Sequence, residues 1–240
     1  MQYFIGCSGF HNKDWKEAFY PKGLSQRKWF EFYSSQFNTL ELNTTFYRFP
    51  KIEFLQKWYD TSPANFKFSV KAPRLITHYK QLNDCHDLLD DFYNTVQAGL
   101  KEKLGTILLQ FPAKIIYSEE FLQRIIQNLD VSFNNVVEFR NAEWWNQHVL
   151  TTLSAYNISF SGISIKGLPD EIISNTAVIY YRFHGIPKLY YSQYPAQEIR
   201  NFSNELKEKA GSKTAYIFFN NTATLAAINN AHELQHFLAD

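Results

Sequence analysis

Short runs rich in β-branched and aromatic residues recur along the chain, and polar or turn-forming residues separate them. Such runs are typical of strands in the interior of an α/β fold. The stretch TLELNTTFYRFP, residues 39–50, reads as one of them, with proline at its end. We predict eight strands, at residues 3–10, 40–46, 66–72, 106–111, 135–140, 158–163, 178–184 and 215–220.

Apolar residues between several of these strands repeat at helical spacing. Residues 88–104 and 121–129 each predict a helix with one apolar face, and Ser118 is a candidate N-cap for the second. Two further helical faces follow at residues 199–206 and 227–238. Helices therefore alternate with strands along most of the chain.

This alternation predicts the fold class. Because no proline-, glycine- or serine-rich linker divides the chain, we expect a single α/β domain over residues 1–240. Eight strands in a chain of this length predict a (β/α)8 TIM barrel, and a doubly wound open sheet is the alternative. Residues 167–176 are short and poorly patterned, so the sixth β/α unit is predicted to be irregular or shortened.

Composition and charge argue against a secreted protein, a membrane-spanning protein and one that attracts nucleic acid through its net charge. The 240 residues are 45% hydrophobic, 20% charged and 18% aromatic, which predicts dense packing or stacking on planar or sugar-like ligands. A net charge of +1 creates no long-range field, so anion binding needs a local cluster of basic groups. The two cysteines, the lack of a signal-peptide pattern and the absence of an apolar run near ~20 residues predict a cytoplasmic protein without a membrane partner. Cys7 is expected to be a buried core residue and not a nucleophile.

Polar residues recur near the C-terminal ends of the predicted strands, at alternate positions whose side chains face the same way. Alternate strand residues face the same way, and the C-terminal strand ends of a barrel meet at one mouth, where catalytic groups are held. A buried carboxylate such as Glu41 needs a counter-ion or a ligand. The pairs that share a face are Glu41 with Asn43, Ser69 with Lys71, Leu108 with Gln110, Glu138 with Arg140, Arg182 with His184, and Phe218 with Asn220. We predict one shared site at the mouth, and the alternative is a set of ion pairs that serves the fold alone.

Several segments also resemble a known family. They are IGCSGF, FNTLELNTTFYRFP, FKFSVKAPRLITH, ILLQFP, VEFRNAEWW, YYRFHG and FFNNTATLAAINNA. Together they are similar to the domain-of-unknown-function 72 family of YecE-like TIM-barrel proteins, from the first strand to the last helix. The resemblance implies the TIM-barrel fold and no established activity.

The charges at the predicted mouth favour an anionic ligand. Lys71, Arg140 and Arg182 would keep Glu41 and Glu138 ionised. We therefore predict acid/base chemistry on a small phosphorylated or carboxylated molecule, without a redox cofactor, and leave open whether the enzyme is a hydrolase, a lyase or an isomerase.

The candidate residues fall into two groups by role. The catalytic candidates are Lys71 as acid or oxyanion stabiliser, Glu41 or Glu138 as base, and His184 as proton shuttle. Candidates for substrate binding are the anion clamps Arg140 and Arg182, His78 in a basic loop, and the orienting amides Asn43, Gln110 and Asn220.

Three other functions remain open. Glu41 and Glu138 could form the carboxylate pair of a glycoside hydrolase, although nearby cations oppose the raised pKa that a general acid needs. A metal-dependent nuclease or phosphodiesterase could use both carboxylates with His184 as ligands, but the same cations would repel a metal ion. A non-catalytic anion-binding module would need only the basic cluster.

A zinc signature near the C-terminus carries little weight. The pentapeptide HELQH at residues 232–236 fits H-E-x-x-H, but no third ligand follows it in this sequence. We expect no resident metal. Nucleic acid is a less favoured partner than a small anion, and the oligomeric state is left open.

Overall fold

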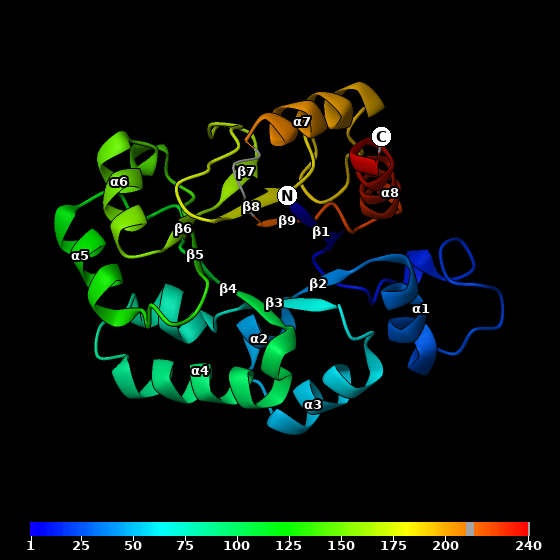
Figure 1. The fold of residues 1–240 in the computed structure, drawn as a ribbon, viewed down its shortest axis with the longest axis horizontal. Coiled ribbons are helices and arrows are strands. Elements are labelled where there is room, and N and C mark those ends of the chain that lie inside the picture. Colours follow the sequence, from blue (N-terminus) through cyan, green and yellow to red (C-terminus); the bar gives the residue numbers. More distant parts are fainter. Residues whose placement is uncertain (210–213, 240) are drawn as a thin grey trace.

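The computed structural model describes residues 1–209 and 214–239. Within these ranges, nine parallel strands form a nearly closed barrel (Figure 1). The strands are β1 (Gln2–Cys7), β2 (Thr39–Leu42), β3 (Lys67–Lys71), β4 (Leu104–Gln110), β5 (Asn135–Glu138), β6 (Ser159–Phe160), β7 (Gly162–Ser164), β8 (Val178–Phe183) and β9 (Thr214–Phe219). Strands β1 to β6 pair consecutively, β7 pairs with β8, β8 pairs with β9, and β9 pairs with β1.

Strands β6 and β7 are two parts of one extended segment that is interrupted at Ser161. Strand β6 pairs with β5, whereas β7 pairs with β8, and the amide of Ser161 donates to the carbonyl of Val137 at 2.8 Å. The segment therefore passes from one neighbour to the other at this residue. All eight predicted strands are present, and the predicted TIM barrel is confirmed.

Helices connect the strands and cover the outside of the barrel (Figure 1). They are α1 (Trp29–Gln36), α2 (Thr44–Tyr47), α3 (Ile52–Thr61), α4 (His86–Leu100), α5 (Glu119–Asn128), α6 (Gln147–Ala155), α7 (Ala196–Glu208) and α8 (Ala226–Ala239). Short 3₁₀ turns cover Lys13–Trp15, Gln26–Lys28, Lys101–Lys103 and Ala142–Trp144, and a π-helical turn covers Leu75–Lys80. The predicted cap is present, because the Ser118 hydroxyl accepts from the amide of Phe121 at 3.2 Å.

The chain departs from regular β/α alternation at two places. Residues 165–177 contain no helix, so the sixth unit is shortened as predicted. The stretch 39–50, in contrast, is not a single strand: β2 ends at Leu42, and α2 follows directly. The Thr45 hydroxyl lies 2.9 Å from the carbonyl oxygen of Leu42 and 2.6 Å from that of Lys71. These contacts hold the turn against β3, and this local hydrogen bonding outweighs the strand propensity of the sequence.

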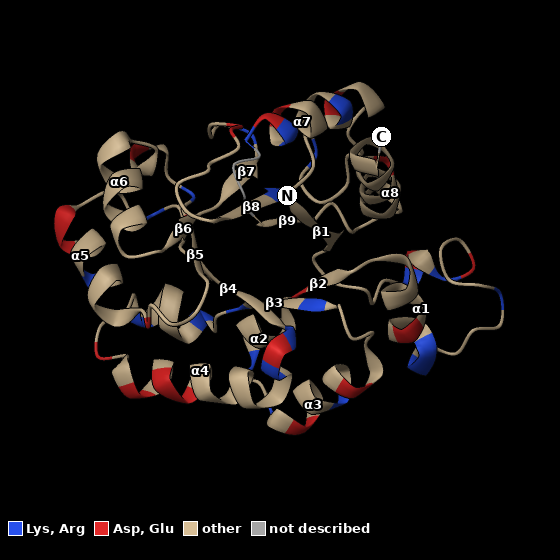
Figure 2. Ribbon diagram, viewed as in Figure 1, with Lys and Arg blue, Asp and Glu red and all other residues tan. Residues whose placement is uncertain are grey.

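The inside of the barrel is apolar below a layer of charged side chains at the C-terminal strand ends, which includes Glu41, Glu138 and Arg182. The interior cluster consists of Phe4, Leu108, Val136, Tyr180, Tyr216 and Phe218. Phe4 stacks on Tyr216 with 4.8 Å between ring centroids. Gly105 leaves room for the Tyr216 ring, since a Cβ at this position would lie 2.7 Å from the Tyr216 hydroxyl. The larger core lies between the strands and the helices. Figure 2 shows acidic residues on the outer helix α4 and basic residues on β3.

Candidate functional site

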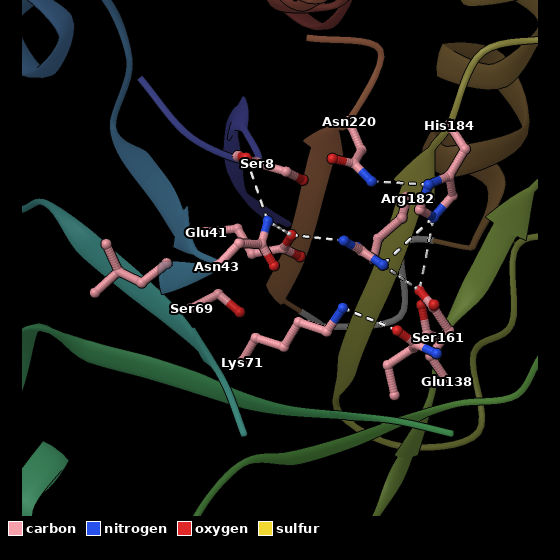
Figure 3. A network of polar contacts seen from close by, with 12 residues as sticks. Ser8, Glu41, Asn43, Ser69, Lys71, Glu138, Ser161, Arg182, His184 and Asn220 are labelled. Carbon is pink, nitrogen blue, oxygen red and sulfur yellow. Dashed lines mark hydrogen bonds and ion pairs between the residues drawn. The ribbon is translucent and has the colours of Figure 1, made fainter. Parts of the chain in front are cut away.

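Arg182 lies at the centre of the charged layer. It comes from the end of β8, and only 1% of its surface is exposed. Its Nη2 lies 2.7 Å from Oε1 of Glu41, and its Nη1 lies 2.8 Å from Oε2 of Glu138 (Figure 3). One guanidinium therefore joins two buried carboxylates from different strands, β2 and β5, and Arg182 is the counter-ion that the sequence required for Glu41.

Further hydrogen bonds fix both carboxylates. Glu41 accepts from the Tyr180 hydroxyl at 2.7 Å and from the Asn43 amide at 3.0 Å, and Glu138 accepts from Nε of Arg140 at 2.7 Å. Burial by itself would raise their pKa values. Nevertheless, attraction to Arg182 holds the pKa of Glu41 below its usual range, and Arg140 and Arg182 hold that of Glu138 well below it. Both groups are therefore fixed as carboxylates.

His184 is a neutral member of the same network. Its Nε2 lies 3.1 Å from Nη2 of Arg140 and 3.4 Å from Nη1 of Arg182. Because guanidinium groups only donate, Nε2 must accept, and the ring proton belongs on Nδ1. The Asn220 Nδ2 atom lies 2.9 Å from Nδ1 (Figure 3). With the proton on Nδ1, this amide would have to turn over and present its oxygen as the acceptor. Burial and the neighbouring arginines lower the pKa of His184 to about 3, so the geometry does not favour the predicted proton shuttle.

Lys71 is a buried cation with a different environment. It ends β3, and 8% of its surface is exposed. Its Nζ donates to Oε1 of Gln110 at 2.8 Å and lies 4.2 Å from the ring centroid of Phe46, and no described carboxylate lies within 4.0 Å of it. Burial, followed by repulsion from Arg182, lowers the pKa of Lys71 to about 7. This side chain therefore exchanges between ammonium and amine at neutral pH.

A cavity of about 280 Å³ opens above this layer, and we call it the mouth cavity. Its lining residues are Ser8, Asn43, Phe46, Tyr47, Lys71, Gln110, Arg140, Arg182, Tyr190 and Asn220. A neighbouring cavity of about 430 Å³ shares Gln110, Arg140 and Tyr190 with it and is also lined by His78.

The structure thus brings all ten predicted site residues into one region. Six of them line the mouth cavity, and His78 lines its neighbour. Glu41, Glu138 and His184 lie behind them, fully buried. Their placement at the strand ends was predicted, whereas their catalytic and binding roles stay predictions.

Among the described residues, cations outnumber carboxylates at the mouth despite the near-neutral chain, since Lys71, Arg140 and Arg182 lie with only Glu41 and Glu138. Burial lowers the pKa of His78 to about 4, and nearby cations such as Lys71 add to this effect. Three buried atoms of lining residues, Oγ of Ser8, Oδ1 of Asn43 and Nε of Arg182, make no hydrogen bond with a described residue. Since buried polar atoms normally have partners, these atoms offer a hydroxyl, an acceptor and a donor to a molecule in the cavity.

Several residues of the site were not predicted. Tyr180 bonds Glu41, and its parity with Arg182 was a signal that could have identified it. Phe46 and Tyr47 were assigned to a strand or its continuation, but they lie on α2 at the mouth. Tyr190 comes from the loop after β8, and no pattern in the sequence marks its position.

Other candidate chemistry has little structural support. Within residues 1–209 and 214–239, no group of three or more His, Cys, Asp or Glu side chains is arranged to hold a metal ion. The His232 ring stacks on Phe37 with 4.7 Å between centroids, and its Nδ1 contacts Gln235. Cys7 is fully buried, and burial raises the pKa of its thiol. None of the described helices has the length and apolar character needed to cross a bilayer.

Fold and site together define a TIM-barrel protein with a cationic mouth above a buried Arg–Glu network. The family described as "Protein of unknown function DUF72" matches residues 4–240, and the chain belongs to this family. The resemblance seen in the sequence motifs is therefore confirmed.

Curated relatives carry family names without an activity. The chain is 34% identical to UPF0759 protein YecE of Escherichia coli K12 over 116 residues, which cover 48% of this chain and 42% of YecE. The match thus spans less than half the length of that relative. The chain is 23% identical to UPF0759 protein YunF of Bacillus subtilis over a 270-residue alignment that covers 98% of this chain and 94% of YunF.

Solved structures agree on the architecture. A DUF72 family protein from Thermotoga maritima superimposes with a TM-score of 0.91 at 25% identity, with full coverage of both chains. D-psicose 3-epimerase from Clostridium cellulolyticum superimposes with a TM-score of 0.56 at 10% identity, with coverage of 100% of this chain and 97% of the epimerase. This second likeness shows the barrel fold alone.

Proposed function

We propose that the protein is an enzyme that binds a small phosphorylated or carboxylated molecule in the mouth cavity and acts on it by acid/base chemistry. Lys71 carries the proposal, because its cation is buried beside a cavity without a carboxylate partner. A buried charge without a counter-ion is unfavourable, so an anion that enters the cavity gains a strong electrostatic contact. A pKa of about 7 also suits Lys71 to donate and accept protons at neutral pH.

The other lining residues suit recognition of the anion. Arg140 uses Nε for Glu138 and Nη2 for His184, and it lines the cavity with 15% of its side chain exposed. Amides of Asn43, Gln110 and Asn220 would orient the ligand. In this proposal Glu41 and Glu138 keep Arg182 and Arg140 in position, and Lys71 alone carries the proton.

The geometry gives less support to the alternatives. A glycoside hydrolase needs a carboxyl group with a raised pKa, whereas the pKa values of both carboxyl groups here are lowered. A metal-dependent nuclease needs a ligand cluster, and the described residues contain no such group.

The first test is a thermal-shift screen at fixed ionic strength with inorganic phosphate, sugar phosphates, hydroxy acids and neutral sugars. Binding adds about 2.7 kcal/mol at 100 times Kd, and each kcal/mol raises Tm by roughly 2–4 °C for a chain of this size. We expect shifts of several degrees from anions alone, lost in Lys71→Met and retained in the exposed control Lys22→Met. Larger shifts from neutral sugars that survive Lys71→Met would refute the proposal.

Catalysis is tested separately. Acid/base chemistry predicts that a stabilising anion is converted, or exchanges a carbon-bound proton with ²H₂O, at a rate that NMR can follow. Lys71→Met should abolish this process. Binding without exchange or turnover would indicate an anion-binding module in place of an enzyme.

A further inference from the structure

A groove of about 590 Å³ adjoins the mouth cavity along helices α2 and α3. Its lining residues are Thr44, Thr45, Tyr47, Arg48, Phe49, Pro50, Lys51, Phe54, Leu55 and Trp58. The exposed fractions of Tyr47 and Phe54 are 66% and 62%. Exposed aromatic groups that cluster beside a cavity often mark a binding surface.

Tyr47 joins the groove to the mouth cavity, because it lines both. The Lys71 ammonium lies over the ring of Phe46, and this ring meets Tyr47 edge to face with 5.1 Å between centroids. Two ring contacts therefore separate the unpaired cation from the groove. The two hollows therefore share the Tyr47 side chain as part of their walls.

Charge in the groove has one sign. Of the described lining residues, the charged ones are Arg48 and Lys51, and neither an aspartate nor a glutamate is among them. The guanidinium of Arg74 also lies 5.7 Å from the ring of Tyr47. This combination of aromatic faces and cations favours a ligand with a planar group and negative charge over a neutral apolar ligand.

We propose that the anion recognised at the mouth is the phosphate of a nucleotide, whose base lies in the groove on Tyr47 and Phe54. This inference rests on the proposed function, since it places the phosphate beside Lys71 and Arg140. Every base can stack on an aromatic side chain, so the site should prefer nucleotides to other phosphates but discriminate little between one base and another. A nucleotide with a terminal phosphate occurs both as a free molecule and at the 5′ end of a single-stranded nucleic acid.

The test measures dissociation constants by calorimetry for ribose 5-phosphate, AMP, UMP and a short 5′-phosphorylated oligonucleotide. We expect AMP and UMP to bind about ten-fold or more tightly than ribose 5-phosphate, because stacking adds to the phosphate contact. Phe54→Ala should remove most of this advantage and leave the affinity for ribose 5-phosphate unchanged. The control is Tyr156→Ala, which removes an exposed aromatic side chain outside the groove.

The outcomes separate this inference from the proposed function. Equal affinities for ribose 5-phosphate and AMP, or a nucleotide advantage that survives Phe54→Ala, would overturn the nucleotide assignment and leave an anion site. Failure of every phosphate to bind would overturn the nucleotide assignment, and the proposed function would be refuted only if the hydroxy acids of the thermal-shift screen also failed to bind. Tighter binding of the oligonucleotide than of AMP would support the inference and identify a single strand as the source of the nucleotide.

Discussion

Arg182 and Lys71 are both buried cations at the C-terminal end of the barrel, but their partners differ. Arg182 lies between two carboxylates at 2.7 and 2.8 Å, whereas Lys71 meets a neutral amide at 2.8 Å and an aromatic ring at 4.2 Å. Attraction to Glu138 and Glu41 raises the pKa of Arg182 despite its burial, and burial lowers that of Lys71. Similar positions in the fold therefore give a permanent charge in one case and a titrating group in the other.

This difference separates a structural from a reactive role. The Arg182 network leaves its two carboxylates fully paired, so it stabilises the barrel and sets the local field. No described carboxylate lies within 4.0 Å of the Lys71 ammonium, and Lys71 borders a cavity. An unpaired cation is the group that a bound anion would change most.

The largest expected effect belongs to Arg182→Met. Removing one partner of a buried ion pair costs about 3–5 kcal/mol because it leaves uncompensated charge, and here two carboxylates lose their partner. Urea unfolding should show this loss. The control Lys28→Met removes the exposed pair with Glu31 and should cost less than ~1 kcal/mol. Equal losses in the two variants would contradict the comparison.

Lys71→Met should stabilise the protein, whereas Arg182→Met should destabilise it. A folded-state pKa near 7, against about 10.4 in the unfolded chain, means that the unfolded state binds more protons between these values, so stability contributed by this site rises with pH. The cost of burying the ammonium is complete below pH 7. We expect the variant to be more stable than the wild type by roughly 1–3 kcal/mol at pH 6, since one pKa unit corresponds to about 1.4 kcal/mol, and less so at pH 9. Urea unfolding at both pH values checks this, and a destabilised variant at pH 6 would show that Lys71 is paired.

Gln110→Glu sharpens the comparison with a smaller effect on stability. It places a carboxylate where Lys71 now meets a neutral amide, so it should raise the lysine pKa and give Lys71 an internal counter-ion. We expect unfolding free energy to change by less than ~1 kcal/mol and anion-induced thermal shifts to fall. Gln197→Glu, on the exposed surface of α7, is the control for the added charge. Unchanged shifts in Gln110→Glu would separate anion binding from Lys71.

Local sequence patterns predicted the barrel because each strand carries its own signal. Dense aromatic and β-branched runs marked all eight strands, and parity at the strand ends grouped Glu41, Lys71, Glu138 and Arg182. The division at Ser161 and the turn into α2 were missed, since both depend on pairing with segments distant in the sequence.

The partners within the site also lay beyond prediction. Parity shows that two side chains share a face, but it does not show that Arg182 bridges both carboxylates or that Lys71 bonds Gln110. These choices depend on barrel geometry across many residues of sequence. The difference between the two cations could therefore be read only from the three-dimensional structure.

The most direct test of the account is the pKa of Lys71, measured by NMR of selectively ¹³Cε-labelled lysine in the folded protein, with Lys71→Met to assign the signal. The account predicts a pKa near 7 that rises when a stabilising anion binds. A Lys71 pKa of about 10.4 that does not change with the anion would contradict the central claim, because it would mean that this lysine already has a partner.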